Sequence, residues 1–499
     1  MVLSSSYIVL NQKTKNIQRI IQIMRKRFEV NPVLNLTPIE YVKLPLKSRD
    51  ELPPILAALQ YIFVTPSLNE TIFKLIEKDV VEGKKRTGRP GMDLWQILVL
   101  ASIRDGLDAD FDRLEDLANH HKLIRAILGV DDILDNVWFK YNTIRNNVAH
   151  IKDATLKEIN KVLAKHARKL FNGGKENKMH LKTDSYSLEN NVHFPTDLNL
   201  TWDSIRKCIE LVSRDKTLYE LGGWRKYSYW ISELKSKYRN CACAVFSGGQ
   251  NKEQRVRTRT IDFLERCIRL SQKLKLTMNL AAYKGILRPD IDYFHSMLDK
   301  HIDLVTRRLL CGEKIPHEEK LFSIFETHTE WLKKGKRNPD VELGHRLLIT
   351  TDEHNLIVDY KVMINESDSE QVVGLIGRIE SNFGQGSICS MSFDKGFSSK
   401  ANKEFASNHV EHLCMPKKGR RNKIEAEEES QKQFAKLRKK HSAVESNINC
   451  LEHHGLNRCP DKGINAYLRY AGIGVLAYNL HKIGNFMIKQ KLKKLKRTA

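Results

Sequence analysis

The stretch that organises the predicted fold is Met179-His180-Leu181-Lys182-Thr183-Asp184. Side chains alternate between the two faces of a β-strand. Met179 and Leu181 would therefore point to one face, and His180, Lys182 and Asp184 would point to the other. The pattern predicts a short strand that buries one face and ends in an acid.

A second stretch of the same design lies far downstream, at Ile388-Cys389-Ser390-Met391-Ser392-Phe393-Asp394. Cys389, Met391 and Phe393 are expected to form its apolar row, and Asp394 ends the opposite row. If the two strands lie side by side in one sheet, Asp184 and Asp394 come close together. Two adjacent carboxylates are unfavourable unless a cation is held between them.

A helix further downstream offers a third acid for the same site. Leu437, Val444, Ile448 and Leu451 fall at helical spacing and indicate a buried stripe. Glu445 lies beside that stripe, so its carboxylate is expected to lean over the edge of the sheet. Two Asp and one Glu form a site of hard oxygen ligands. Such a site suits Mg²⁺ or Mn²⁺ and leaves positions open for water and phosphate.

Five other acids compete with Glu445 as the third ligand. Four fall in a charged run without an apolar stripe, which is typical of a solvated helix face. These four are Glu425, Glu427, Glu428 and Glu429. Glu452 is a stronger rival, because it follows Glu445 by seven residues and so lies on nearly the same helix face. Glu445 is the preferred ligand.

The sequence around these acids resembles a known family. Asp184 is followed by Ser-Tyr-Ser-Leu-Glu-Asn-Asn-Val-His-Phe-Pro-Thr-Asp, and Asp394 opens Asp-Lys-Gly-Phe-Ser-Ser. Glu445 lies in Ala-Val-Glu-Ser-Asn-Ile, upstream of Gly-Leu-Asn-Arg-Cys at 455–459 and Gly-Val-Leu-Ala-Tyr-Asn-Leu at 474–480. With Gly-Arg-Pro-Gly-Met at 88–92, these motifs resemble bacterial insertion-sequence transposases of the DDE type, close to the ISNCY group. The resemblance covers most of the chain.

The resemblance implies an RNase H-like catalytic domain in which Asp184, Asp394 and Glu445 are the catalytic and metal-binding residues. They would hold two Mg²⁺ ions, or Mn²⁺. One ion would activate water, and later a DNA 3′-hydroxyl, for in-line attack on a phosphodiester. The other would stabilise the leaving oxygen.

The helix that carries Glu445 departs from the wider DDE pattern. Many relatives place an aromatic residue, an Arg and a Lys where this chain has Arg438, His441 and Glu452. Arg438 and His441 remain candidates for contact with DNA phosphate. Glu452 cannot make such a contact.

The composition favours a polyanionic partner. The chain has 499 residues, with 84 Lys and Arg against 60 Asp and Glu, and a formal net charge of +24. Nucleic acid is the simplest partner for that excess, and a generally basic surface is the alternative. No apolar run reaches the length of a membrane span, and no secretory signal is apparent. Nine scattered cysteines indicate reduced thiols. We therefore expect a cytoplasmic, nucleoid-associated protein without a membrane partner.

Changes of pattern divide the chain into segments. Residues 1–175 are predicted to form an all-α N-terminal DNA-binding domain. An α/β, RNase H-like catalytic domain follows in two parts, 176–201 and 319–485, interrupted by a helical insertion at 202–318. Residues 486–499 form a helix end or a mobile basic tail that is expected to add non-specific DNA affinity.

Two helices behind a basic arm, at about 93–130, are compatible with helix-turn-helix DNA binding, although a plain helical bundle has the same pattern. Asp93 is predicted to cap the first helix in a capping box with Gln96. Asp197 is expected to cap the first helix of the insertion. The candidate phosphate contacts of the arm are Lys84, Lys85, Arg86 and Arg89. A second basic group lies in a loop before a strand, and its candidate phosphate contacts are Lys333, Lys334 and Lys336, although a solvated loop has the same pattern.

These features predict a DDE transposase that cleaves transposon ends in a metal-dependent reaction and joins them to target DNA. Its substrates would be double-stranded DNA, namely terminal inverted repeats and a target duplex. Cutting two ends together implies a homodimer or a larger assembly. Two alternatives stay open: an RNase H-like nuclease without strand transfer, and a DNA-binding protein with a decayed active site.

Overall fold

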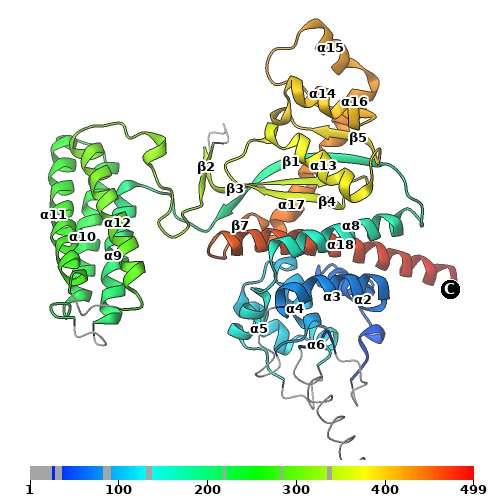
Figure 1. Cartoon of the computed structure of the whole chain (residues 1–499), viewed down its shortest axis with the longest axis horizontal. Helices are drawn as coiled ribbons and strands as arrows, with labels where there is room; N and C mark the ends of the chain where they lie inside the picture. The colour runs from blue at the N-terminus through cyan, green and yellow to red at the C-terminus, as the bar shows by residue number, and fades with distance from the viewer. Residues whose placement is uncertain are drawn as a thin grey trace, which may run out of the picture. The chain divides into compact units, whose positions relative to one another are not determined.

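A computed structural model describes residues 25–28, 36–82, 91–130, 137–216, 221–280, 285–333 and 340–498. The chain is mixed α/β and divides into two compact units (Figure 1). The first unit comprises Met1–Asn191 and Gly344–Ala499, and the second comprises Val192–Leu343. Among the described residues, no helix combines the length and the apolar character that crossing a membrane requires.

The described strands form one seven-stranded mixed sheet. Its order is β2 (Glu330–Lys333), β3 (Val341–Thr351), β1 (Met179–Asn190), β5 (Ile388–Phe393) and β6 (His412–Cys414). β4 (Ile357–Met363) also pairs with β3, and β7 (Arg458–Cys459) with β1. β1 is antiparallel to β3 and parallel to β5, and β5 is parallel to β6. β3 and β4 form an antiparallel hairpin.

The central strand β1 is longer than predicted. It has 12 residues, and Asp184 lies in its middle instead of at its end. Met179 and Leu181 pack in an apolar layer with α13 (Val372–Phe383) and α14 (Lys400–His409). Further along, Tyr186 and Leu188 are buried on the opposite face. The first six residues of β1 alternate as expected. They predict the apolar layer around Met179 and Leu181 but not the second layer, around Tyr186 and Leu188.

The apolar row predicted for β5 is wrong at Cys389. Met179 pairs with Ile388 and His180 with Ser390, so a β-bulge leaves Cys389 without a partner on β1. The bulge breaks the alternation of side chains. Ile388, Met391 and Phe393 are buried in one cluster, whereas Cys389 is only half-buried.

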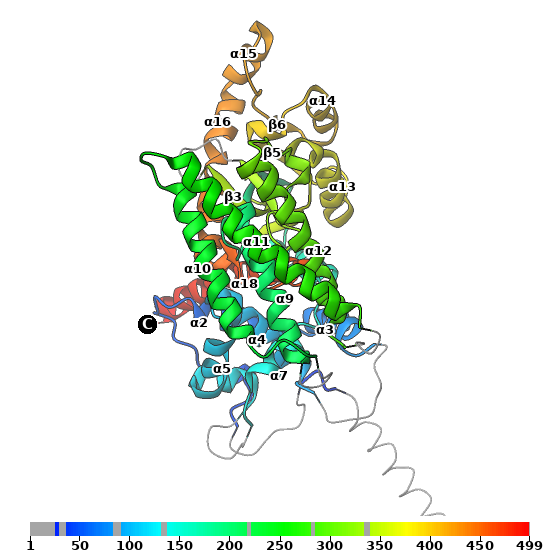
Figure 2. The ribbon, with the colours of Figure 1, turned by 90° about the vertical axis from the view of Figure 1, so that its left-hand side faces the viewer.

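The predicted helix around Glu445 is divided into α16 (Lys432–His441) and α17 (Ala443–Leu451). In Figures 1 and 2, α15 (Lys423–Ser430) and α16 extend away from the sheet near β5 and β6. Val444 and Leu451 of α17 pack with Tyr186 of β1. This packing places the first turn of α17 against the same strand as Asp184.

The N-terminal helices share their core with the C-terminal helix α18 (Ile464–Thr498). The N-terminal helices are α2 (Leu52–Val64), α3 (Pro66–Val80), α4 (Leu94–Gly106), α5 (Phe111–His120), α6 (Lys122–Leu128), α7 (Tyr141–Val148) and α8 (Asp153–Phe171). α18 packs on α2, α4 and α8. The predicted boundaries near 175 and 485 therefore do not separate compact units. The predicted basic tail is the end of α18.

The second unit is helical and has its own core. Its long helices are α9 (Asp197–Asp215), α10 (Tyr227–Phe246), α11 (Lys252–Met278) and α12 (Arg288–Val305), drawn in green in Figure 1. The insertion predicted at 202–318 lies within this wider unit. Thr196, not Asp197, caps α9, because the Thr196 hydroxyl accepts a hydrogen bond from the backbone N–H of Asn199 (3.2 Å). Asp197 pairs with Arg308 (2.8 Å).

Candidate active site

The register of β1 and β5 places Asp184 beside Asp394. Thr183 pairs with Phe393, so the next residue on each of these parallel strands is an acid. Adjacent strands in a sheet lie about 4.8 Å apart. Asp394 directly follows β5 and begins the 3-10 turn η5 (Lys395–Phe397). The two acids therefore come from adjacent strands at the same level of the sheet.

The third predicted acid, Glu445, reaches the same place from the first turn of α17. Its charge acts on Asp184, as do the charges of Asp394 and Asp368. The charges of Asp394 and Glu445 thus both act at Asp184, but among the described residues the ligand atoms of these three acids do not all lie within 4.8 Å of one another. Glu452 begins η6 (Glu452–Leu456), directly after α17. Its charge acts instead on Tyr186, which follows Asp184 by two residues in β1.

The pKa of Asp184 is raised to about 7. Burial of the carboxyl group is the largest cause, and the neighbouring carboxylates add to it. The backbone N–H of Ser185 donates to Asp184 Oδ1 (2.8 Å) and acts in the opposite direction. Asp394 and Glu445 are exposed. Ionisation of Asp184 is therefore unfavourable unless positive charge enters the site.

No Lys or Arg in the described part of the chain forms an ion pair with Asp184, Asp394 or Glu445. Nearby acids differ, since Asp359 and Asp368 are each paired with an arginine. Three unpaired carboxylates form a donor set of hard oxygen atoms, which Mg²⁺ and Mn²⁺ prefer. The types of residue present therefore suit the metal that the sequence predicts, although their ligand atoms are not gathered within 4.8 Å of one another in the described part of the chain.

Asp368 is a fourth acid at the site, and the sequence analysis missed it. It begins the 3-10 turn η4 (Asp368–Glu370) before α13. Asp368 Oδ1 accepts a hydrogen bond from the Ser185 hydroxyl (2.6 Å), and Oδ2 pairs with Arg346 (3.2 Å). The sequence Ser-Asp-Ser-Glu at 367–370 forms a capping box, so it resembles an ordinary helix start. Because the segment has the pattern of a helix start, the sequence did not indicate that Asp368 contacts Ser185 of β1.

His441 lies one helical turn before Glu445. Its Nδ1 forms a hydrogen bond with Ser392 Oγ (3.0 Å), and its Nε2 is buried without a hydrogen-bond partner among the described residues. Burial lowers the pKa of His441, against the charges of Asp394 and Glu445. The structure therefore places an unpaired ring nitrogen close to two of the acids.

The other predicted DNA contacts are not at this site. Arg438 lies near Glu429 (3.6 Å), and Lys333 is the exposed last residue of β2 in the second unit. The remaining candidates are outside the described residues: Lys84, Lys85, Arg86, Arg89, Lys334 and Lys336. Glu429 is buried and paired with Arg421 (3.0 Å), so the prediction of a solvated face was wrong for this residue.

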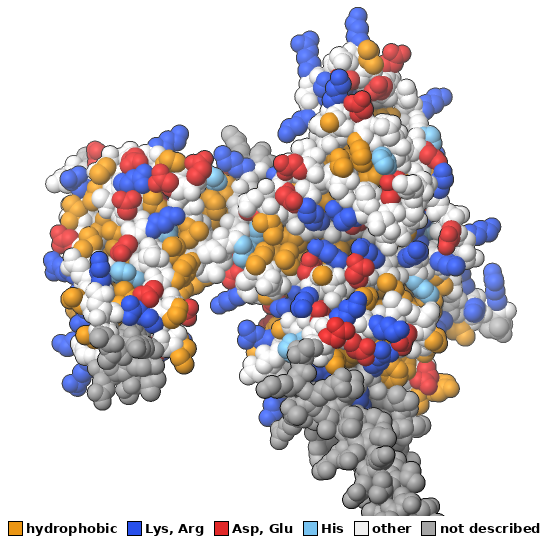
Figure 3. Space-filling model, viewed as in Figure 1, with side chains coloured by type: hydrophobic (Ala, Val, Ile, Leu, Met, Phe, Trp, Pro, Cys, Tyr) orange, Lys and Arg blue, Asp and Glu red, His pale blue; other side chains and the backbone are white. Residues whose placement is uncertain are grey.

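The helices at about 93–130 pack as a bundle. The capping box of Asp93 and Gln96 is confirmed at the start of α4. Every residue of α4 except Gln96 is buried, so α4 offers no exposed face for a DNA groove. The exposed positions of α5 include Asp112 and Asp116. Figure 3 shows Lys and Arg side chains spread over one face of the molecule among acids, not gathered in one patch.

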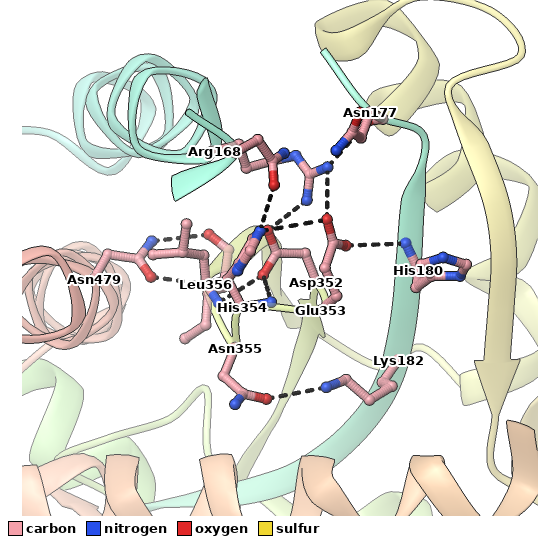
Figure 4. A network of polar contacts seen from close by, with 12 residues as sticks. Arg168, Asn177, His180, Lys182, Asp352, Glu353, His354, Asn355, Leu356 and Asn479 are labelled. Atoms are coloured by element: carbon pink, nitrogen blue, oxygen red, sulfur yellow. Dashed lines mark hydrogen bonds and ion pairs between the residues drawn. The ribbon is translucent and has the colours of Figure 1, made fainter. Parts of the chain in front are cut away.

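A network of polar contacts fixes the strand that carries Asp184 (Figure 4). Arg168 of α8 pairs with Asp352 (2.5 Å) and Glu353 (3.0 Å) in the β3–β4 turn. The backbone N–H of His180 donates to Glu353 (3.1 Å). Lys182 Nζ donates to the side chain of Asn355 in the same turn (3.0 Å). These contacts tie the hairpin turn to β1 two residues before Asp184.

Comparison with known proteins identifies no relative. A scan against models of protein families, a search of curated proteins and a search of solved structures each found no match to this chain. The function is therefore inferred from the resemblance of the motifs and from the chemistry of the site.

Proposed function

We propose that the chain is a DDE transposase that cleaves transposon ends and joins them to target DNA. The observation that carries the proposal is the pairing of Thr183 with Phe393. It sets Asp184 beside Asp394, where the charge of Glu445 also acts. Three acids on separate elements, with no Lys or Arg paired to them among the described residues, suit metal-dependent chemistry on phosphodiesters.

The sheet supports an RNase H-like catalytic domain within the first unit. The hairpin β3–β4 lies on one side of β1, and the parallel strands β5 and β6 lie on the other. α13 connects β4 to β5. The resemblance implies this order of hairpin, helix and strand.

Asp184, Asp394 and Glu445 would hold the divalent metal ions. When bound, Mg²⁺ supplies Lewis acidity for attack of water or a DNA 3′-hydroxyl on a phosphodiester. The surrounding residues position the carboxylates: the N–H of Ser185 holds one oxygen of Asp184, and its hydroxyl holds Asp368. His441 Nε2 is buried, so it would hydrogen-bond a phosphate oxygen near the acids only after its side chain moved.

The test is Mg²⁺-dependent cleavage of a DNA fragment that carries the element's own ends. We expect Asp394→Asn to lower the cleavage rate by about 10³-fold, because loss of a metal ligand removes several kcal/mol of transition-state stabilisation. DNA binding should persist. Glu452→Gln is the matched control, since this rival acid lies in η6 (Glu452–Leu456) and its charge acts on Tyr186. Equal cleavage by wild type and Asp394→Asn would show that Asp394 is not a ligand.

The products of the same reaction separate the transposase from the two alternatives. Joining of the cleaved ends to a second duplex supports transposition. Cleavage without joined products indicates a nuclease on the same fold. Retained DNA binding with no metal-dependent cleavage by the wild-type chain indicates a DNA-binding protein.

A further inference from the structure

A second group of potential metal ligands lies near the start of β5, away from Asp394. The Sγ of Cys389, a carboxylate oxygen of Glu411 and a ring nitrogen of His412 all lie within 4.8 Å of one another. Asp394 follows Cys389 by five residues, which is about 16 Å along an extended strand. This group is therefore distinct from the carboxylate site.

The β-bulge in β5 explains the placement of the cysteine. Cys389 falls between the residues that pair with β1, so its side chain does not follow the alternation of the strand. On the other side of β5, Ser390 pairs with His412, the first residue of β6. Glu411 immediately precedes that residue. Two adjacent strands thus bring a thiol, a carboxylate and an imidazole to one point.

A cation already lies in this group. The ammonium of Lys178 forms an ion pair with Glu411, and the same carboxylate accepts a hydrogen bond from the Cys389 thiol. Lys178 and Glu411 are both about half exposed, so their ion pair contributes little free energy. A divalent ion can displace the ammonium and receive the carboxylate, the imidazole and, after loss of its proton, the thiolate.

We propose that Cys389, Glu411 and His412 bind a divalent ion of the Zn²⁺ type. Thiolate, imidazole and carboxylate are the ligands that Zn²⁺ takes in proteins, whereas Mg²⁺ prefers oxygen ligands. Binding releases the Cys389 proton to solvent and frees Lys178. Three protein ligands leave one position for water. The site ties β5 to β6 and does not depend on the proposed transposase activity.

The test adds Co²⁺ to the metal-free full chain and follows absorption. A thiolate bound to Co²⁺ gives a charge-transfer band, which a site of carboxylates alone cannot give. We expect this band in wild type, with saturation at about one equivalent, and its loss in Cys389→Ser. Cys243→Ser is the matched control, because Cys243 is an exposed thiol on α10 in the second unit. This control should keep the band.

Two further variants separate ligand loss from misfolding. His412→Gln keeps the thiol and should weaken Co²⁺ binding by about tenfold or more. Lys178→Met removes the competing ammonium and should tighten binding by about two- to fivefold. Misfolding cannot produce that gain. A wild-type chain without the band, or a Cys389→Ser variant with the wild-type band, would overturn the proposal.

Discussion

At the scale of single residues, a buried acid far from the candidate site contributes to the expected pH dependence of stability. Asp105 of α4 is buried, and neither carboxylate oxygen has a hydrogen-bond partner among the described residues. Burial raises the pKa of Asp105 to about 7, against the charge of Arg104. Arg104 already donates two hydrogen bonds to Asp461 (3.0 and 2.7 Å). We therefore expect Asp105 to hold a proton while Asp461 carries the charge opposite Arg104.

The sign of the effect follows from proton linkage. Unfolded Asp105 ionises near pH 4, so between about pH 4 and 7 only the folded chain holds this proton. This contribution is fully present below about pH 4 and is lost progressively as the pH rises to about 7, by up to about 4 kcal/mol. Asp105→Asn should flatten the decline in the free energy of unfolding, measured with urea from about pH 5 to 8. Asp112→Asn, which changes an exposed acid, is the control and should keep the wild-type decline in the free energy of unfolding. Equal slopes for wild type and Asp105→Asn would contradict the assignment.

The sequence pointed to single acids but not to their supporting contacts. Asp184, Asp394 and Glu445 could be selected as candidate ligands because each lies beside a local apolar pattern. Each of these patterns is visible within one short stretch of sequence. Asp368 could not be selected, since its contact with Ser185 spans 183 residues. The contact of Lys182 with Asn355 spans 173. Local patterns carry no information on such pairs.

At the scale of elements, the sequence predicted where the strands lie better than it predicted how long they are and which side chains they bury. The alternation of β1 changes after Asp184, because the second half of the strand packs on α17 and α18 instead of α13. The bulge at Cys389 is set by pairing with β1. Each of these differences arises from tertiary contacts that a period of two or 3.6 residues does not encode. The basic segment 486–499 was predicted as a helix end or a tail, and its described residues are the end of α18.

The contact between α18 and α2 depends on a glycine. A Cβ at Gly484 would lie 1.7 Å from the carbonyl oxygen of Pro54, a backbone atom that cannot rotate away. Gly484→Ala should therefore lower the free energy of unfolding by about 1–3 kcal/mol. Gly377→Ala is the matched control, because a Cβ there meets no atom within 4 Å in helix α13. Alanine should stabilise that helix by about 0.5–1 kcal/mol.

Urea unfolding measures both changes. Wild-type stability in Gly484→Ala would mean that the helices adapt without cost.

At the scale of the whole molecule, the inserted unit has the properties of an independent folding unit. The described residues of Val192–Leu343 bury apolar side chains from α9, α10, α11 and α12 in one cluster. Trp224 is completely buried there, and its indole N–H donates to Thr277 Oγ1 (3.0 Å). The sequence placed the insertion at 202–318 from the change of period alone. It missed residues 192–201, which include the first turn of α9, and residues 319–343, which include β2.

We expect a fragment of residues 192–343 to fold without the rest of the chain, because its hydrophobic cluster is complete within it. Circular dichroism should show a helical fragment with a near-ultraviolet signal from its tryptophans, Trp202, Trp224, Trp230 and Trp331, and both signals should disappear in one cooperative urea transition. Phe263→Ala, in the centre of α11, should cost about 3–5 kcal/mol. Leu276→Ala, 71 % exposed on the same helix, should leave the midpoint nearly unchanged. A helical fragment without the near-ultraviolet signal would mean that the side chains of this core pack in fixed positions only when the first unit is present.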